Sequence, residues 1–547
     1  MESIPRNASS VKRVTSANFL FWLAVFIAAC SPVSDSDLDR SILNRGLSGE
    51  PESLDPHRST SNQAEAVLRD IGEGLISYAA DGTLEAGVAF RWEESDDGLL
   101  YTFHLRPQAR WSDGSKVLAS DFEFAFRRLV APQTAAPYAE FISAIRNARE
   151  IVNGEMSPEK LGVIAIDDHT LQVRLHTPTP HFLQLLTHPS TFPISRRIFG
   201  NIGDSLFVPG NYISNGAYVL EEWNVGSAIY LRRNEFFWNN ESTNIEKVIY
   251  HFVDQNAEFD RYRARELDVT ANVPESVFLK VREERPSELR VSPYLGIYYY
   301  GFNMTKAPFS NNLKLRQALS IAIDRNVLVD KITGRGEVPA FSWVPPGVHL
   351  YAQQKNEFAI LDNGEREEMA RRLFAEAGVG LGDEFVFELR YNTFDGHQRI
   401  ALAIQSMWRD VLGVKAILVN EEFKVFIDNV SSKDKTEVFR LSWTGDYNDA
   451  LSFLQLMKSN NPSNLTGYSS PEFDQVLSLA EREPDPVARK SHLERAERIA
   501  MADYPAIPLY FYVSKHLVSP AIVGWKDNVM DVHLSRHLSR AESSKPH

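Results

Sequence analysis

The chain contains one cysteine, Cys30, among its 547 residues, and it has no excess of positive charge. A single cysteine excludes an intramolecular disulfide, so stability must come from packed cores. Lys and Arg number 58 against 72 Asp and Glu, which gives a net charge of -14. That balance disfavours a nucleic-acid-binding protein and a basic membrane-adhesion face, since both need clustered cations.

Long apolar runs and the common hydrolase motifs are also missing. No segment after residue 29 approaches the roughly eighteen uninterrupted apolar residues of a membrane-spanning helix. The sequence has no Gly-x-Ser-x-Gly and no His-Glu-x-x-His, and His176, His181 and His188 lack a tight zinc-ligand spacing. We therefore expect no catalytic residues, no metal and no cofactor, and a secreted peptidase is a disfavoured alternative.

The N-terminus has the pattern of an export signal. Residues 1–13 are polar and include three cations, and residues 17–29 are apolar. An apolar stretch this short is typical of a signal-peptide core rather than a membrane span. It ends in Ile-Ala-Ala-Cys, so we expect residues 1–29 to be removed, Cys30 to be lipidated, and residues 30–37 to form a tether. A plain secretory signal with an incidental cysteine is the alternative. Either signal places the body outside the cytoplasm.

The rest of the chain mixes helical and strand patterns. Its length is too great for one core, which predicts two or three domains. Strict alternation predicts strands at 100–106 and 169–175, and an apolar run predicts a strand at 416–419. Helices are expected at 370–377, where Gly378 provides a C-terminal cap, and at 401–412, 471–482 and 487–502. The interspersed order indicates an α/β or α+β protein of several lobes.

One long helical segment is expected to start near Leu313. Leu315, Leu319, Ile323 and Leu328 recur on one side of it, as the buried face of a helix requires.

Several blocks recur in the order and spacing of a known family. They are 50–57, 69–75, 101–114, 165–170, 215–218, 298–300 and 440–449. From about residue 48 to about residue 534 the sequence resembles the periplasmic oligopeptide-binding proteins of ABC importers, the peptide type of extracellular solute-binding protein family 5. The block at 109–114 also forms a turn by its own chemistry, and we interpret it as structural, with Trp111 packed beneath it.

The resemblance implies an α/β periplasmic-binding-protein fold. Two hinged lobes close over a ligand, and the peptide type has an additional inserted domain. Lobe one would comprise residues 38–72, 198–297 and 513–547, the inserted domain residues 73–197, and lobe two residues 298–512.

The implied function is capture of peptides in the cleft between the lobes. The ligand would pass to an inner-membrane permease and ATPase complex. The protein would be a monomer in the periplasm, held to a membrane only by its lipid, with no nucleic-acid partner.

A receptor for many peptides must bind their constant groups. The ammonium needs a carboxylate, the backbone can pair as an added strand, and the carboxylate needs Arg, Lys or His. The resemblance assigns Asp446 to the ammonium, the strand 441–443 to the backbone, and Arg440 to a position near the bound chain. It assigns Trp443 to the pocket wall, His397 to a peptide carboxylate, and Tyr138, Tyr294 and Tyr299 to the cleft lining.

Each of these residues also has a structural alternative. Arg440 could instead hold Asp446 or another carboxylate in place. His397 could be a surface or capping residue, and the tyrosines could belong to the core.

Three positions depart from the family pattern. Thr60 and Gly301 stand where peptide-binding relatives carry glutamate, and Phe423 replaces a pocket tryptophan. A preference for lysine-rich peptides is therefore doubtful. Within the family the ligand could also be a dipeptide or tripeptide, a murein peptide, a nickel chelate, haem or an oligosaccharide. A lipid-anchored chaperone or adhesion scaffold is a further alternative, but it would require an exposed apolar groove.

Overall fold

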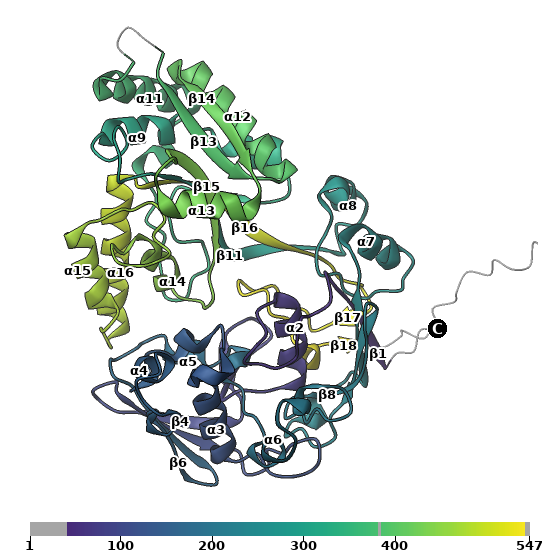
Figure 1. Ribbon diagram of the computed structural model, residues 1–547. Coiled ribbons are helices and arrows are strands. Elements are labelled where there is room, and N and C mark those ends of the chain that lie inside the picture. Colours follow the sequence, from purple (N-terminus) through teal and green to yellow (C-terminus); the bar gives the residue numbers. More distant parts are fainter. Residues whose placement is uncertain (1–40, 381–383, 542–547) are drawn as a thin grey trace, which may run out of the picture.

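A computed structural model describes residues 41–380 and 384–541 of the chain. It has the two-lobed α/β architecture that the sequence predicts (Figure 1). Within these ranges, none of the helices combines the length and apolar character needed to cross a bilayer. The predicted signal peptide, Cys30 and the tether lie outside the described residues.

The first lobe is built on a four-stranded sheet in the order β1-β10-β9-β8. The strands are Ile42–Leu47, Lys247–Phe252, Ala228–Arg233 and Tyr218–Asn224. Helix α2 (Asn62–Ile71) begins at Ser61, whose hydroxyl accepts the amide of Ala64. Its apolar face is buried in one core with the sheet. The opposite part of α2 is thereby left to face the cleft.

A second sheet forms within residues 73–197. Its order is β4-β5-β7-β6, comprising Ala89–Glu94, Leu100–Leu105, Thr170–Arg174 and Val163–Asp167. This confirms the predicted strands at 100–106 and 169–175. Helix α3 (Ala119–Val130) packs into the core of this sheet. The smaller β2 (Ile76–Tyr78) and β3 (Leu84–Ala86) pair with each other beside it.

Two polar contacts tie this segment together and to the first lobe. Arg128 on α3 pairs with Asp55 at 2.7 Å, and both side chains are buried. The Trp111 ring is buried, and its indole N–H donates to Asp121 at 3.1 Å. The structural interpretation of the 109–114 turn is therefore confirmed.

The second lobe contains a six-stranded sheet in the order β12-β16-β11-β15-β13-β14. The strands are Val338–Pro339, Ala506–Leu517, Leu289–Phe302, Val438–Thr444, Val386–Asn392 and Lys415–Glu421. One face packs against α9 (Leu313–Ile321), α11 (Asn363–Ala377) and α12 (Asp395–Leu412). The other packs against α13 (Phe423–Ser432), α15 (Pro471–Ala480) and α16 (Pro486–Asp503).

The expectation of one long helix from Leu313 is wrong. Helix α9 stops at Ile321, and a short α10 (Arg325–Val327) leads into a π-helical turn at Leu328–Thr333. Asp324 starts the new helix by accepting the amide of Val327 at 3.0 Å. The four apolar side chains named above are all buried. Their spacing therefore predicted burial correctly, but it did not predict where the helix ends.

Strands β11 and β16 run from the second sheet toward the first lobe (Figure 1). Their ladder extends from Gly301–Ala506 to Leu289–Leu517, and Leu517 then accepts the amide of Thr270 at 3.0 Å. The register shifts between Pro293 and Ile297. The boundaries placed at 297/298 and 512/513 fall inside these continuous strands, and the division into domains at those residues stays a prediction.

The loop after β15 is fixed by a buried ion pair between Asp449 and Arg489 of α16. The two bonds measure 2.6 and 2.9 Å, and Asp449 also accepts the amide of Leu451. Asp449→Ala would leave the Arg489 cation buried and unpaired, which costs about 3–5 kcal/mol of unfolding free energy. Urea denaturation measures this loss.

An exposed pair between α16 and the neighbouring α15 provides a matched control. Arg495 and Glu472 lie 3.0 Å apart with more than half of each side chain exposed, so Glu472→Ala should cost under about 1 kcal/mol. Adding Arg489→Met to Asp449→Ala should recover part of the loss. An equal effect of the two single changes would contradict the role assigned to Asp449.

Candidate functional site

Strand β15 has a free edge where it approaches the cleft. On one side it pairs with β11 along its whole length, from Phe302–Val438 to Gly296–Thr444. On the other side β13 pairs only with Val438 and Phe439. Among the described residues, no strand covers the second edge from Arg440 to Thr444. Such an edge offers backbone donors and acceptors to an extended ligand.

Asp446 follows directly after this edge. Gly445 turns the chain there, with its amide donating to Leu295 at 2.8 Å. The Asp446 side chain borders a cavity of about 320 Å³. Residues from both lobes line it, namely Asn62, Glu65, Arg69, Tyr138, His188, Tyr294, Asp446 and the segment 530–534.

The Asp446 carboxylate has no ion-pair partner within the described parts of the chain. The side chain is exposed to solvent at the cavity, and the surrounding residues of both lobes partly desolvate it. This desolvation is the main reason why its pKa is raised; Glu65 raises it further and His188 acts in the opposite direction. A cation that entered the cavity would relieve both unfavourable effects.

Three neighbouring residues were not singled out by the sequence. Glu65 of α2 pairs with Arg69 at 2.8 Å and with His188 at 3.2 Å. Burial alone would raise the Glu65 pKa, but Arg69 and His188 outweigh it and hold the pKa at about 2. The Tyr138 ring lies 4.4 Å from that of His188. Glu65 and Arg69 lie one helical turn apart, but His188 is more than 100 positions away, so no sequence pattern indicated that the three meet.

Arg440 lies on the face of the sheet that carries Tyr298 and Tyr300. Its guanidinium sits 4.6 Å above the Tyr298 ring and donates to Asn392 and Ser442 at 3.2 Å and to the Tyr512 hydroxyl at 3.4 Å. No carboxylate pairs with it in the described ranges, and its Nε–H has no acceptor there. It is therefore a largely buried cation without a counter-ion, and it does not pair with Asp446.

His397 joins the Arg440 cluster at the start of α12. Its Nδ1 lies 3.3 Å from the Tyr298 hydroxyl. Burial and the charge of Arg440 lower its pKa to about 3. The imidazole is therefore neutral near pH 7, and it can accept or donate a hydrogen bond but provides no positive charge.

The predicted aromatic residues take different places. Tyr294 and Tyr138 border the cavity beside Asp446. Trp443 is half-buried, and its indole N–H has no partner among the described residues. Tyr299 packs in the core, with its ring 4.7 Å from that of Trp343. Adjacent strand residues point to opposite faces, which separates Tyr299 from Tyr298.

The structure also shows the surroundings of the three residues that depart from the family pattern. A Cβ at Gly301 would meet the Phe439 ring at 2.5 Å, so this position holds no larger residue without rearrangement. Phe423 is largely exposed at the start of α13. Thr60 hydrogen-bonds through its hydroxyl to the carboxylate of Glu52 at 3.2 Å.

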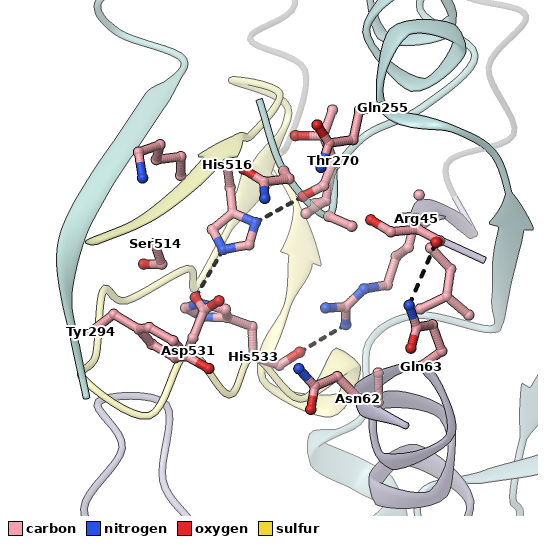
Figure 2. A pocket seen from close by; sticks show the side chains of 18 of the residues that line it. Arg45, Asn62, Gln63, Gln255, Thr270, Tyr294, Ser514, His516, Asp531 and His533 are labelled. Atoms are coloured by element: carbon pink, nitrogen blue, oxygen red, sulfur yellow. Dashed lines mark hydrogen bonds and ion pairs between the residues drawn. The ribbon is translucent and has the colours of Figure 1, made fainter. Parts of the chain in front are cut away.

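A second cavity of about 540 Å³ adjoins the first (Figure 2). The two share Arg45, Asn62, Tyr294, Asp531 and His533 in their linings. Figure 2 shows Tyr294, His516 and Asp531 on one side of this cavity and Arg45 and Asn62 on the other. The two cavities together form a polar cleft between the lobes.

Comparisons with known proteins agree with this architecture. Residues 83–464 match the bacterial extracellular solute-binding proteins, family 5. The periplasmic oligopeptide-binding protein OppA of Salmonella typhimurium is 38% identical, covering 93% of this chain and 94% of that protein.

Two solved structures resemble the chain throughout. The unliganded open form of the periplasmic murein tripeptide-binding protein MppA superposes with a TM-score of 0.84 at 35% identity, covering 92% of this chain and 98% of that one. The Haemophilus influenzae OppA complex with RPPGFSPFR gives 0.74 at 34% identity, covering 92% and 99%. The chain therefore belongs to family 5 of the bacterial extracellular solute-binding proteins.

Proposed function

We propose that the protein is the lipid-anchored substrate-binding component of an ABC importer, which captures peptides in the cleft between its lobes. The observation that carries this proposal is the arrangement of charge along β15. Within residues 41–380 and 384–541, the cation Arg440 has no counter-ion and begins the unpaired strand edge, and the anion Asp446 has no ion partner and follows its end.

A free peptide that runs antiparallel to β15 has complementary groups at the matching ends. Its ammonium would pair with Asp446, and its backbone would hydrogen-bond to the edge at 440–444. This edge spans about 13 Å at the usual rise per residue, the length of an extended peptide of about four or five residues. Arg440 would then attract the carboxylate, either directly or through Tyr512.

The other predicted residues would support this pose. Tyr138 and Tyr294 would flank the ammonium and the first side chain, and Trp443 would line the wall. Neutral His397 would donate a hydrogen bond rather than an ionic contact. Tyr299 would not contact the peptide and would support the site indirectly, by packing beneath the strand that carries it.

The two strands that join the lobes, β11 and β16, would allow the lobes to close during transport. Rotation at the irregular β11–β16 ladder would close the lobes over the peptide. An inner-membrane permease and its ATPase would then accept the ligand. A lipid on Cys30 would keep the receptor near them on the periplasmic side, and no nucleic acid, cofactor or catalytic step is involved.

The ammonium contact is tested by removing either partner. Asp446→Ala should weaken binding of a free tetrapeptide by about 3 kcal/mol or more, over a hundredfold, because the ammonium would stay in the cleft without a counter-charge. N-acetylation of the same peptide should weaken its binding to the wild-type protein by a similar free energy. Isothermal titration calorimetry measures both.

The combination of the two changes is the decisive comparison. The acetylated peptide should bind wild type and Asp446→Ala about equally, since each change removes the same contact. Asp434→Asn, at an exposed aspartate on the same lobe, should leave every affinity unchanged. Equal affinity of wild type for free and acetylated peptides would contradict the assignment.

Murein peptides are a second candidate, because the open murein tripeptide-binding protein superposes with a TM-score of 0.84. A γ-linked residue lengthens the backbone and would interrupt pairing with the 440–444 edge. We therefore expect an all-α-linked tripeptide to displace a fluorescent tetrapeptide at a lower concentration than the murein tripeptide. The reverse order would assign the cleft to murein peptides.

The lipid anchor has its own test in intact bacteria. A clickable palmitate analogue should label the wild-type protein and should fail to label Cys30→Ala, since Cys30 is the only thiol in the chain. Labelling of both proteins to the same extent would show that Cys30 is not the lipidation site.

A further inference from the structure

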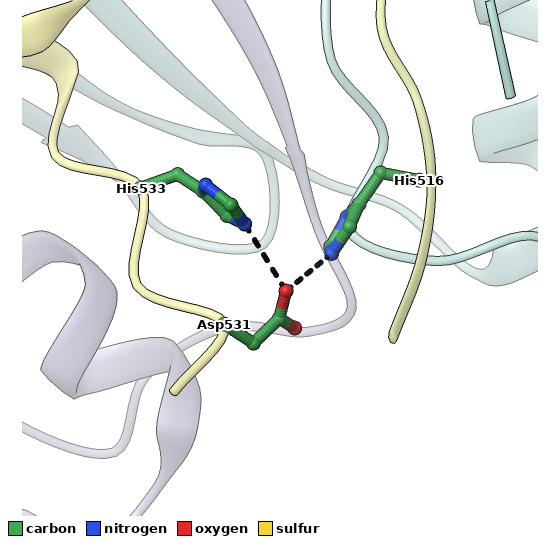
Figure 3. Close-up of side chains that lie close together, drawn as sticks. All are labelled: His516, Asp531 and His533. Atoms are coloured by element: carbon green, nitrogen blue, oxygen red, sulfur yellow. Dashed lines mark hydrogen bonds and ion pairs between the residues drawn. The ribbon is translucent and has the colours of Figure 1, made fainter. Parts of the chain in front are cut away.

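Two histidines and one aspartate converge on the wall of the larger cavity. His516 lies on β16, while Asp531 and His533 belong to the C-terminal segment after β17 (Ile522–Val523). The Asp531 Oδ1 atom lies 2.8 Å from His516 Nε2 and 3.1 Å from His533 Nε2 (Figure 3). One ligand atom from each residue lies within 4.8 Å of the others. None of the three contacts assigned to the peptide uses this cluster.

Surrounding contacts hold each donor in place. His516 Nδ1 lies 2.8 Å from the carbonyl oxygen of Thr270. A carbonyl can only accept, so Nδ1 carries a hydrogen; Nε2 donates to Asp531 when the ring is protonated and becomes a free metal ligand when the ring is neutral. The His533 ring stacks on Trp525 with 3.6 Å between the ring centres.

The Asp531 backbone is also fixed. It has a φ of 55°, a left-handed conformation that few residues other than glycine adopt. Its amide donates to the carbonyl of Asn528 at 3.1 Å. The neighbouring cation Arg45 binds the main-chain carbonyl of His533 at 2.7 Å, which leaves the His533 ring nitrogen and the Asp531 carboxylate directed at each other.

Two imidazole Nε2 atoms and a carboxylate oxygen converge at this point, and with both rings neutral these three atoms can bind one cation together. We propose that His516, Asp531 and His533 bind one divalent transition-metal cation, with Zn²⁺ as the best match. Without an ion, a protonated His516 and a neutral His533 can both donate to Asp531 Oδ1. A metal ion satisfies all three donors together, and the Thr270 carbonyl supplies the outer hydrogen bond that such a histidine ligand commonly has.

The donor set and its spacing suit zinc. Two imidazoles with one carboxylate are a common three-residue zinc set. Ligands at about 2.0–2.1 Å in a tetrahedron lie about 3.3–3.4 Å apart. The two Asp531–imidazole distances of 2.8 and 3.1 Å need to lengthen by only a few tenths of an ångström, and all three ligand atoms already lie within 4.8 Å of one another. All three residues line the 540 Å³ cavity, which leaves a fourth position for water or for a carboxylate in the cleft.

This site extends beyond peptide capture. A bound ion would join the crossing strand β16 to the C-terminal segment that lines both cavities. It would therefore stabilise the wall of the cleft without contacting the peptide ammonium.

The test is zinc binding by the purified full chain without a polyhistidine tag and with Cys30→Ser, which removes the one thiol ligand. Equilibrium dialysis should find one zinc ion per chain, and thermal unfolding should shift upward with zinc. His516→Gln and His533→Gln should each lower zinc affinity by at least about a hundredfold, more than loss of an outer-shell partner usually costs. His537→Gln is the matched control, since His537 lies in the same segment and instead contacts the Tyr78 carbonyl at 3.1 Å.

X-ray absorption on the zinc-loaded chain tests the ligands without a substitution. It should show two imidazole nitrogens in the first shell at about 2.0–2.1 Å. Absence of stoichiometric zinc, or undiminished binding in both glutamine variants, would overturn the proposal and leave the cluster as a hydrogen-bonded triad. Peptide affinity by calorimetry is recorded in parallel, and it can fail or succeed independently of the zinc result.

Discussion

The antiparallel pairing of β11 with β16 is the constraint on which the rest of the structure depends. This ladder joins the second sheet to the first lobe, and its irregular stretch lies at Tyr294, beside the cavity. Among the strands that the structure describes, β11 is the one full-length partner of β15, and it therefore decides which edge of β15 is left unpaired. The other strand, β16, carries Tyr512 to Arg440 and His516 to the C-terminal segment. The same two strands therefore connect the lobes and position the residues between them.

The short segment after β15 carries two aspartates with different roles, one that stabilises the loop and one that is available to a ligand. Asp449 is buried and bound by both arms of Arg489, so it anchors the loop. Three residues earlier, Asp446 faces the cavity with no counter-ion in the described chain. An unpaired charge in an enclosed site is unfavourable in the free protein, and a ligand of opposite charge relieves that cost. The Asp449–Arg489 pair fixes the loop that carries Asp446. Arg440 is likewise a charge without an ion partner among the described residues, and its guanidinium lies over the Tyr298 ring.

Sequence patterns predicted the elements more completely than the site. Alternation located β5 and β7, and capping chemistry located the end of α11 at Gly378, because both depend on neighbouring residues. The prediction of one helix from Leu313 was wrong because Asp324 caps a new helix. The apolar spacing continues across this break, so it gave no sign that the first helix ends. The approach of His188 to Glu65 and Arg69 could not be found from spacing, since only tertiary packing brings it to them. The opposite faces of Tyr298 and Tyr299 follow from strand alternation alone, which favours the core alternative for Tyr299.

The central claim is that the two unpaired charges and the free edge of β15 take up a peptide with a free amino terminus. Mass spectrometry of small molecules released from protein purified without denaturation tests this most directly. The account predicts a mixture of short peptides of varied sequence with unmodified amino termini, absent from Asp446→Ala prepared in the same way. Recovery of a single compound without an α-amino group, in equal amount from both proteins, would contradict it.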